Sequence, residues 1–300
     1  MSTRRASNGG RTRLVNGGSN IQRKRTGKPS RTERRVHHRA RDGGASMTGD
    51  GYSLVLHGDA DASKLGGTAV CGFSSIGMVG VIAASHIIRA LDLEQMGTVL
   101  DENFPAMALV QDAVPKHPVR VYQGEEVGVF TSEIQFPGAY DVKFAETVLK
   151  WFTEGGFNRL LIIDGVVTNE LGEKEDSDLW GVASHPLGRK ALSAAGVSRM
   201  KQGVVSGIAG YLLSEGDRRG LDITALLAEC NPMYPDARAA AIATEAVAEL
   251  IDREIPLGAL LEDARRIEDN VREMFEKSQS MLPAPEGYDV SNAGDDPMVN

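Results

Sequence analysis

The sequence predicts an α/β sandwich built on a mixed sheet, and three observations support that prediction. Short apolar runs alternate with helix-like patterns along the chain, which is typical of α/β folds. Residues 68–71 form an apolar, partly β-branched run that leads through a glycine-rich turn into a helical pattern over 81–91. The stretch GEEVGVF, which begins at Gly124, indicates a hairpin that gives the sheet some antiparallel character.

The first half of the predicted domain supplies most of the strands. We expect strands at 52–57, 68–71, 98–100, 106–110, 119–122 and 127–134, with a polar turn over 58–67. Residues 141–152 repeat apolar side chains at steps of three and four, so they predict a helix that ends at Gly155-Gly156.

The second half alternates more regularly. The apolar run 160–163 predicts a strand that stops at Asp164-Gly165, and the acidic segment 168–178 predicts an exposed loop. A short strand at 182–184 leads into a helix that ends near Gly196, and residues 203–213 repeat the plan of strand, glycines and helix. After a strand at 223–228, Asp236 begins an Ala-rich helix that reaches Asp252. Residues 257–277 predict an amphipathic helix whose apolar stripe would serve internal packing or an oligomer seam.

The charge of the chain is divided unevenly. Residues 1–46 hold 13 Lys and Arg against Glu33 and Asp42, a net charge of +11. Because the whole chain of 300 residues carries −8, the remaining 254 residues carry −19. An acidic body of this size argues against non-specific binding of nucleic acid by the folded part.

Composition also predicts where the folded part begins and ends. The basic segment 1–46 has few large apolar residues and is expected to be disordered. It is either an arm that could bind nucleic acid or an extension that is not translated, because the composition changes sharply at Met47. Residues 47–278 are expected to form a single α/β domain that ends in the amphipathic helix, and residues 279–300 a flexible acidic tail.

Cysteine usage and hydropathy indicate a cytoplasmic protein. Cys71 and Cys230 are the only cysteines, with no CxxC pair and no histidines at ligand spacing. Neither a disulfide framework nor a metal site is indicated, and no cofactor is expected. No apolar run approaches the roughly 18 residues of a membrane span, and the N-terminus lacks the apolar core of a secretory signal.

The turn after residue 71 is the first candidate site. Gly72, Gly77 and Gly80 have GxxxxGxxG spacing, and a turn of this kind before a helix could present unpaired N–H groups to an anion. The motif is incomplete, because Met78 replaces the P-loop lysine and Ser74 replaces the second glycine of a dinucleotide fingerprint. The alternative is that the glycines let a helix pack closely on a strand.

Polar residues at predicted strand ends permit an enzymatic interpretation. The carboxylates are Asp101, Glu102, Glu133 and Asp164, and the hydroxyls in the two glycine turns are Ser74, Ser75 and Ser206. In open α/β sheets, ligands collect beyond the carboxyl ends of strands, so such groups could support hydrolysis or phosphorolysis. Turn chemistry explains the same positions without a reaction, and no catalytic residue is assigned.

The candidate ligand or partner loop follows from these two arguments. It comprises Gly72, Phe73, Ser74, Ser75, Gly77, Gly80, Asp164, Ser206 and Gly207. His86 is expected to be a surface or interface histidine, and Cys71 a small core residue.

Four pieces of the sequence occur in an order that resembles a known family. They are GFSSIGMVG after a strand, NFPAMALVQDAVPKHPVRVY, LLIIDGV and NPMYPDARAAAIA. Together with the closing amphipathic helix they resemble the proteasome assembly chaperone 2 family, in its archaeal branch, over roughly residues 64–277. The resemblance implies a three-layer αβα fold similar to nucleoside phosphorylases, without their activity, plus C-terminal helices. It also implies a homo-oligomer that binds α-type subunits of the proteasome core.

One feature departs from the family pattern. Chaperones and activators of this kind can end in a hydrophobic–Tyr–any tripeptide, whose carboxylate pairs with a lysine between α subunits. This chain ends in Met298-Val299-Asn300, with valine at the tyrosine position. The resemblance therefore does not carry that contact to this chain.

The sequence favours a non-enzymatic binding module of the chaperone type over an enzyme. The alternative is a phosphorylase- or hydrolase-like enzyme that uses the turn over 72–80 to bind an anionic ligand. No membrane partner is expected, and nucleic acid is expected only through the basic segment.

Overall fold

The computed structural model describes residues 46–47, 52–57, 66–111, 113–167 and 179–262. These residues all belong to the unit that spans residues 41–300. The basic segment up to residue 45, the acidic loop 168–178 and the tail 279–300 lie outside the described residues, so the expectations for them stay predictions.

The described residues form twelve strands, five complete α-helices and the first residues of a further helix, 258–262. The strands are β1 (Ser46–Met47), β2 (Ser53–Leu56), β3 (Thr68–Phe73), β4 (Glu94–Leu100), β5 (Leu109–Gln111), β6 (Val114–Lys116), β7 (Val119–Gln123), β8 (Val127–Ser132), β9 (Arg159–Val166), β10 (Leu179–Ala183), β11 (Ser198–Arg199) and β12 (Ile223–Glu229). The α-helices are α1 (Val79–Ala90), α2 (Asp141–Glu154), α3 (Pro186–Ala194), α4 (Gly207–Arg219) and α5 (Ala237–Ile251). Two 3₁₀ helices, η2 (Ile76–Met78) and η3 (Gly138–Tyr140), precede α1 and α2.

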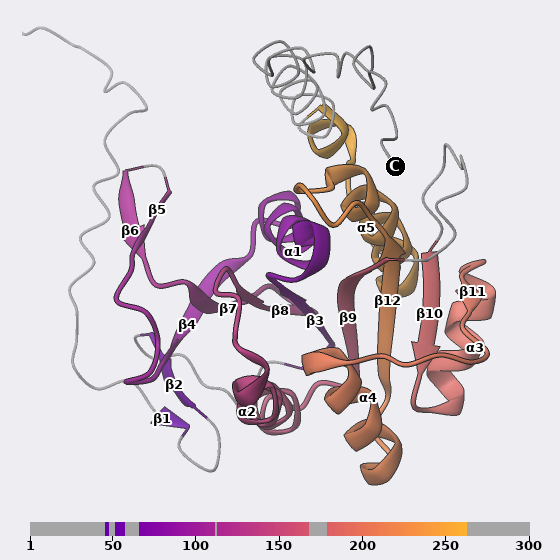
Figure 1. Ribbon diagram of the computed structural model, residues 1–300, viewed down its shortest axis with the longest axis horizontal. Helices are drawn as coiled ribbons and strands as arrows, with labels where there is room; N and C mark the ends of the chain where they lie inside the picture. Colours follow the sequence, from indigo (N-terminus) through magenta and orange to yellow (C-terminus); the bar gives the residue numbers. More distant parts are fainter. Residues whose placement is uncertain (1–45, 48–51, 58–65, 112, 168–178, 263–300) are drawn as a thin grey trace, which may run out of the picture. The chain divides into compact units, whose positions relative to one another are not determined.

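Ten of these strands form one mixed sheet in the order β1-β2-β4-β7-β8-β3-β9-β12-β10-β11 (Figure 1). The four central strands β8, β3, β9 and β12 are parallel. The hairpin of β7 and β8 is antiparallel, as are the pairs of β4 with β7 and of β10 with β12. The predicted mixed character of the sheet is therefore confirmed.

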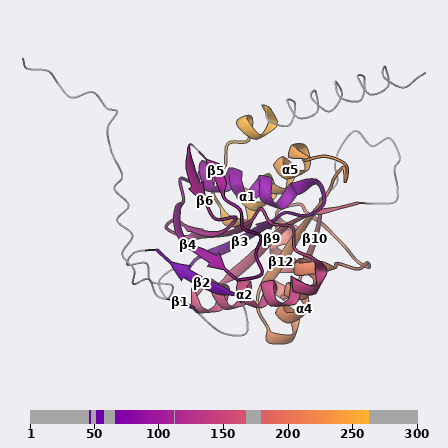
Figure 2. The ribbon, with the colours of Figure 1, turned by 60° about the vertical axis from the view of Figure 1, so that its left-hand side comes forward.

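Helices cover both faces of the sheet and complete three layers. Helices α1 and α5 lie on one face, and α2 and α4 lie on the other (Figures 1 and 2). The core under α2 and α4 contains Phe130, Phe144 and Trp151, and the core under α1 and α5 contains Ile87 and Leu161. All five side chains are buried. The αβα sandwich is confirmed.

Helix α1 lies unusually close to the strands beneath it because glycines face each other at the contact. A Cβ atom added at Gly72 of β3 would overlap the carbonyl oxygen of Gly80 in α1. A Cβ atom added at Gly80 would lie 2.5 Å from the carbonyl oxygen of Ile163 in β9. The structure thus supports the packing interpretation of these two glycines, since only a residue without Cβ permits this approach.

Most predicted elements are present, with shifted ends. The helix that begins at Asp236 is confirmed, and the Asp236 carboxylate accepts a 2.9 Å hydrogen bond from the Ala239 N–H at the helix start. The predicted hairpin is confirmed as β7 and β8. The strand predicted at 106–110 is present only as β5, and its partner β6 was not predicted. β6 contains Pro115, and proline in a sequence argues against a strand because it cannot donate a ladder hydrogen bond.

Two predictions of the second half are wrong. Strand β9 does not stop at Asp164-Gly165, because these residues stay in register with Leu227 and Ala228 of β12. Residues 203–205 form no strand, and Val204 is exposed rather than buried in the sheet. The chain there passes directly into α4.

The closing helix is described only at its start. Residues 258–262 are helical, and Leu260 packs in a small buried cluster with Ala237 and Ala241 of α5. The apolar stripe beyond residue 262 lies outside the described residues.

We predict that Gly80→Ala destabilises the protein by at least about 2 kcal/mol, because the added methyl group overlaps the backbone of β9 and β3. Urea unfolding measures the change in the free energy of unfolding. Gly258→Ala is the matched control, since a Cβ atom there meets nothing within 4 Å, and its change should stay within about 0.5 kcal/mol. Equal stability of the two variants would contradict the packing argument.

Candidate functional site

The candidate site lies between two neighbouring strands, β3 and β9, whose chain connections lead to opposite sides of the sheet. From β3 the chain passes through α1 to β4, β7 and β8 on one side, whereas from β9 it continues to β10 and β12 on the other. β3 and β9 are adjacent parallel strands, so a crevice opens beyond their carboxyl ends. Ligands in open α/β sheets bind at such positions.

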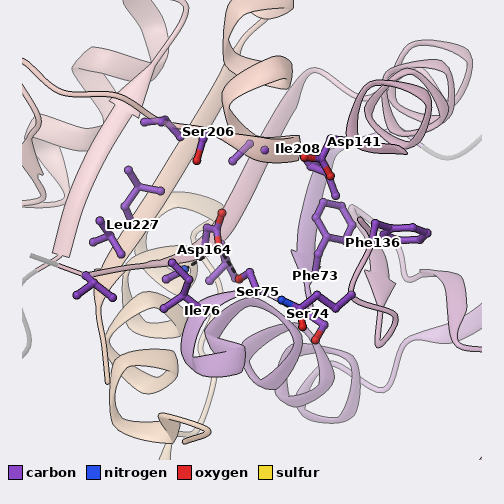
Figure 3. A pocket seen from close by; sticks show the side chains of 18 of the residues that line it. Phe73, Ser74, Ser75, Ile76, Phe136, Asp141, Asp164, Ser206, Ile208 and Leu227 are labelled. Carbon is purple, nitrogen blue, oxygen red and sulfur yellow. Dashed lines mark hydrogen bonds between the residues drawn. The ribbon is translucent and has the colours of Figure 1, made fainter. Parts of the chain in front are cut away.

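A pocket of about 380 Å³ occupies this position on the face covered by α2 and α4 (Figure 3). Its walls come from the loop after β3, the end of β9, the loop after β8 and the start of α4. The lining residues are Phe73, Ser74, Ser75, Ile76, Gln135, Phe136, Asp141, Ile163, Asp164, Gly165, Val166, Val167, Met200, Val204, Val205, Ser206, Gly207, Ile208, Ala209 and Leu227.

A hydroxyl–carboxylate pair lies in the pocket wall. The Ser75 Oγ–H donates a hydrogen bond of 2.5 Å to Asp164 Oδ1 (Figure 3). The Gly165 N–H donates a second bond, of 2.8 Å, to the same oxygen. Both interactions therefore converge on Oδ1.

The strand period explains why Asp164 points into this pocket. Leu160 and Ile162 of β9 belong to the core under α2 and α4, whereas Leu161 and Ile163 belong to the opposite core. Side chains alternate along a strand, so Asp164 shares the face of Leu160 and Ile162. The core ends at this residue, where the pocket begins.

Burial raises the pKa of the Asp164 carboxyl above its ordinary value, and the hydrogen bonds from Ser75 and Gly165 partly offset that effect. The carboxylate is disfavoured because it has left bulk water without gaining a cationic partner. Asp164 is therefore a group whose ionised form lacks an opposing charge.

Asp141 supplies a second carboxylate to the pocket from the first turn of α2. Its Oδ2 lies 3.7 Å from the position that a Cβ atom on Gly207 would occupy, at the start of α4. Burial raises the pKa of the Asp141 carboxyl as well. Gly207 has a φ of +67°, a conformation that favours glycine.

The chemistry of the lining is apolar and acidic. Phe73, Phe136 and Ile208 contribute apolar surface, while Ser74 and Ser206 add hydroxyl groups. Among the described lining residues there is no Lys, Arg or His. An anion in this pocket would therefore meet two carboxylates and no opposing side-chain charge.

The structure brings together some of the residues that the sequence singled out. Ser74, Ser75, Asp164, Ser206 and Gly207 all line the pocket, as does Phe73. Gly72, Gly77 and Gly80 do not line it.

The three glycines serve packing instead. A Cβ atom at Gly77 would lie 2.8 Å from Cys230 Sγ, and Gly77 has a φ of +61°. Gly72 and Gly80 form the close contact between β3 and α1 described above.

The other carboxylates at strand ends lie elsewhere. Asp101 accepts a 2.7 Å hydrogen bond from Lys143, and Glu102 is exposed. Glu133 forms an ion pair with buried Arg120 and lines a different cavity beside α1. None of the three belongs to the pocket lining.

His86 and Cys71 are both in the interior. The expected surface position of His86 is wrong: only 5% of the residue is exposed, and its Nε2 lies 2.8 Å from the carbonyl oxygen of Pro256. Cys71 is fully buried in the core, as predicted, and burial raises its thiol pKa well above the usual range.

Sequence reasoning missed Asp141, Gln135 and Phe136 as pocket residues. Asp141 reads as an ordinary helix start, since acidic residues favour the first turn. One pattern could have indicated these residues. They follow β8, a strand parallel to β3 and next to it, so the segment after β8 must begin at the same edge of the sheet as the loop after β3.

None of the described helices has the length and apolarity needed to cross a membrane. Among the described residues, no group of three His, Cys, Asp or Glu side chains is arranged to hold a metal ion.

Comparison with known proteins shows a match to one family model. The model described as the PAC2 family matches residues 69–275. An uncharacterised protein of Methanocaldococcus jannaschii is 26% identical over 210 residues, covering 70% of this chain and 86% of the relative.

Solved structures of the same architecture are also found. A Pyrococcus furiosus protein, PbaA, described as an archaeal homolog of proteasome-assembly chaperone, matches with a TM-score of 0.67 and 26% identity. The match covers 73% of this chain and 91% of PbaA. PbaB of the same organism, described as an archaeal proteasome activator, shares the fold with a TM-score of 0.64 at 22% identity, over 75% of this chain and 99% of PbaB.

We predict that Asp164→Asn raises the melting temperature at neutral pH. The native pKa of Asp164 is raised, so its ionised form is less stable in the folded than in the unfolded chain. An asparagine oxygen keeps the two hydrogen bonds without the charge. The gain should shrink as the pH falls toward the ordinary Asp pKa of about 4, where the wild-type carboxyl is protonated. Melting curves between pH 4 and 8 test this, and a gain that grows at low pH would contradict it.

Proposed function

Because the chain belongs to the PAC2 family, we propose that it is a non-enzymatic protein-binding module that acts as a proteasome assembly chaperone. In this proposal the protein self-associates, binds α-type subunits of the proteasome core and acts in the cytoplasm. The family match over residues 69–275 is the observation that carries the proposal. The likeness to PbaA in both sequence and fold supports it.

Exposed apolar side chains at the pocket edge of the sheet suit a protein partner. Val204 is 92% exposed and Met233 is 81% exposed. Val204 lies in the segment before α4, and Met233 lies in the loop after β12, whose carboxyl end points to the same edge as that of β9. Large apolar residues in solvent at one edge are typical of a surface that a partner covers.

We predict that the double substitution of Val204 and Met233 by serine weakens capture of α-type subunits at least about tenfold. Truncation of a central apolar anchor typically costs an interface about 1–2 kcal/mol or more. A pull-down with purified α-type subunits, performed over a range of salt concentrations, measures the change.

Leu187→Ser is the matched control for that experiment. Leu187 is also an exposed apolar residue, with 59% exposure, but it follows β10, which runs antiparallel to β12 and ends at the opposite edge. Failure of the wild-type protein to capture any α-type subunit would overturn the proposed partner. Equal loss with Leu187→Ser would overturn the proposed surface.

The β5–β6 hairpin supports self-association. These two strands form a separate two-stranded sheet, and Val110 is 71% exposed on it while Val114 is 52% exposed. An isolated hairpin is marginally stable in water, so an apolar partner surface would stabilise this one. A second copy of the chain would supply such a surface.

We predict that Val110→Asp lowers the sedimenting mass of the protein, because a charge at the centre of an apolar contact opposes association. Sedimentation velocity over a range of concentrations measures the mass. Val142→Asp in the first turn of α2 is the control, as Val142 is also exposed, at 51%. A wild-type protein that sediments as a monomer at all concentrations would contradict self-association.

A further inference from the structure

We infer that the pocket between β3, β9 and α4 is a binding site for an organic cation, an ammonium or guanidinium group on a short apolar chain. This inference does not depend on the proteasome as a partner. The inference concerns a ligand inside the pocket, whereas the surface proposed for a protein partner, with Val204 and Met233, lies at the exposed edge of the pocket.

The size and composition of the pocket suit a small amphipathic ligand. Its volume of about 380 Å³ lies within the range of small-molecule sites. Most of its lining is apolar, and a few polar groups converge in one region, as Figure 3 shows for Ser75 and Asp164. Ligand sites commonly combine an apolar wall with a few placed polar groups.

Asp164 has an oxygen available for a ligand. Its Oδ1 accepts both hydrogen bonds, from Ser75 and from Gly165. Within the described part of the chain, its Oδ2 accepts no hydrogen bond. An ammonium or guanidinium donor would bind that oxygen and supply the opposing charge that the protein does not.

Asp141 adds a second acceptor on another wall. No hydrogen bond joins its side chain to another described residue, although its Oδ2 lies near Gly207 at the start of α4. The partial positive charge of that helix end interacts favourably with the Asp141 carboxylate. Asp141 also lies in the first turn of its own helix, α2, so we assign the principal charge contact to Asp164 and a secondary one to Asp141.

Two aromatic rings favour a cation further. Phe73 and Phe136 both line the pocket and lie on its Asp141 side (Figure 3). The face of an aromatic ring attracts a cation, and this attraction increases when the cation is shielded from water. With no basic side chain among the described lining residues, the pocket selects against anions such as phosphate.

Isothermal titration calorimetry with ligands of matched chain length tests the inference. The probes are hexylammonium, hexylguanidinium, hexanol, hexanoate and orthophosphate, each titrated into the full chain at pH 7.5. We expect the two cations to bind at least about tenfold more tightly than hexanol, and hexanoate and phosphate to show no binding. Loss of one hydrogen bond to a charged group corresponds to a decrease in binding affinity of about tenfold or more.

Three variants locate the site. Asp164→Asn should weaken hexylammonium binding at least about tenfold, and Asp141→Asn should weaken it less. Glu245→Gln on α5 is the matched control, because it removes one exposed carboxylate on the other face of the sheet. The affinity of this variant for hexylammonium should stay within about twofold of the wild-type value. Circular dichroism melting verifies that each variant is folded.

The outcomes separate cleanly. Absence of cation binding up to about 10 mM, or unchanged affinity in both pocket variants, overturns the inference. Binding of phosphate or hexanoate as tight as that of the cations also overturns it and favours the anion-binding enzyme instead. A blocked Gly-Lys-Gly peptide distinguishes the sources: tighter binding than hexylammonium assigns the pocket to a lysine side chain of a protein, and weaker binding assigns it to a free amine.

Discussion

The close approach of α1 to the centre of the sheet is the constraint on which the candidate site depends. Gly72 and Gly80 face each other at this contact, and Gly165 brings the end of β9 against the carbonyl oxygen of Ile76. The loop that joins β3 to α1 is also held by backbone hydrogen bonds, from the Ser74 N–H to the Ser132 carbonyl and from the Asp236 N–H to the Gly77 carbonyl. Ser75 is held over Asp164 as a result. The glycine spacing that looks like a phosphate cradle is therefore the support of the site rather than its binding surface.

The pocket concentrates negative charge in a protein part that is already strongly acidic. Two carboxylates share a largely apolar lining, and burial raises the pKa of both. Groups of this kind reduce the stability of the folded chain unless something else compensates, which is the physical ground for the binding role that we propose for them. Asp101 and Glu133 differ from them, because each has a cationic partner within the protein.

Local pattern predicted the architecture well, and the site only in part. Alternating apolar runs were sufficient to predict the three layers and the β7–β8 hairpin. Asp236 was sufficient to predict the start of α5. Asp164 was found as a candidate for a partly wrong reason, since it lies inside β9 rather than after it. Its pairing with β12 cannot be seen from neighbouring residues, because that partner is about sixty residues further along the chain. Asp141 was missed for the same reason: only the folded sheet brings the start of α2 next to the start of α4.

The pocket lies where the chain connections from β3 and β9 run to opposite sides of the sheet, so its walls come from distant parts of the sequence. This arrangement also determines when the pocket can form during folding. Phe73 and Ser206 are separated by most of the domain in sequence, and the walls between them come from β8 and β9. Contacts of such long sequence separation form late, because the loop entropy must first be offset by the sheet. During synthesis the pocket cannot be complete until β12, which contributes Leu227 to the lining, has left the ribosome. A ligand bound there would therefore recognise only chains whose central sheet is already complete, and would discriminate finished molecules from nascent ones.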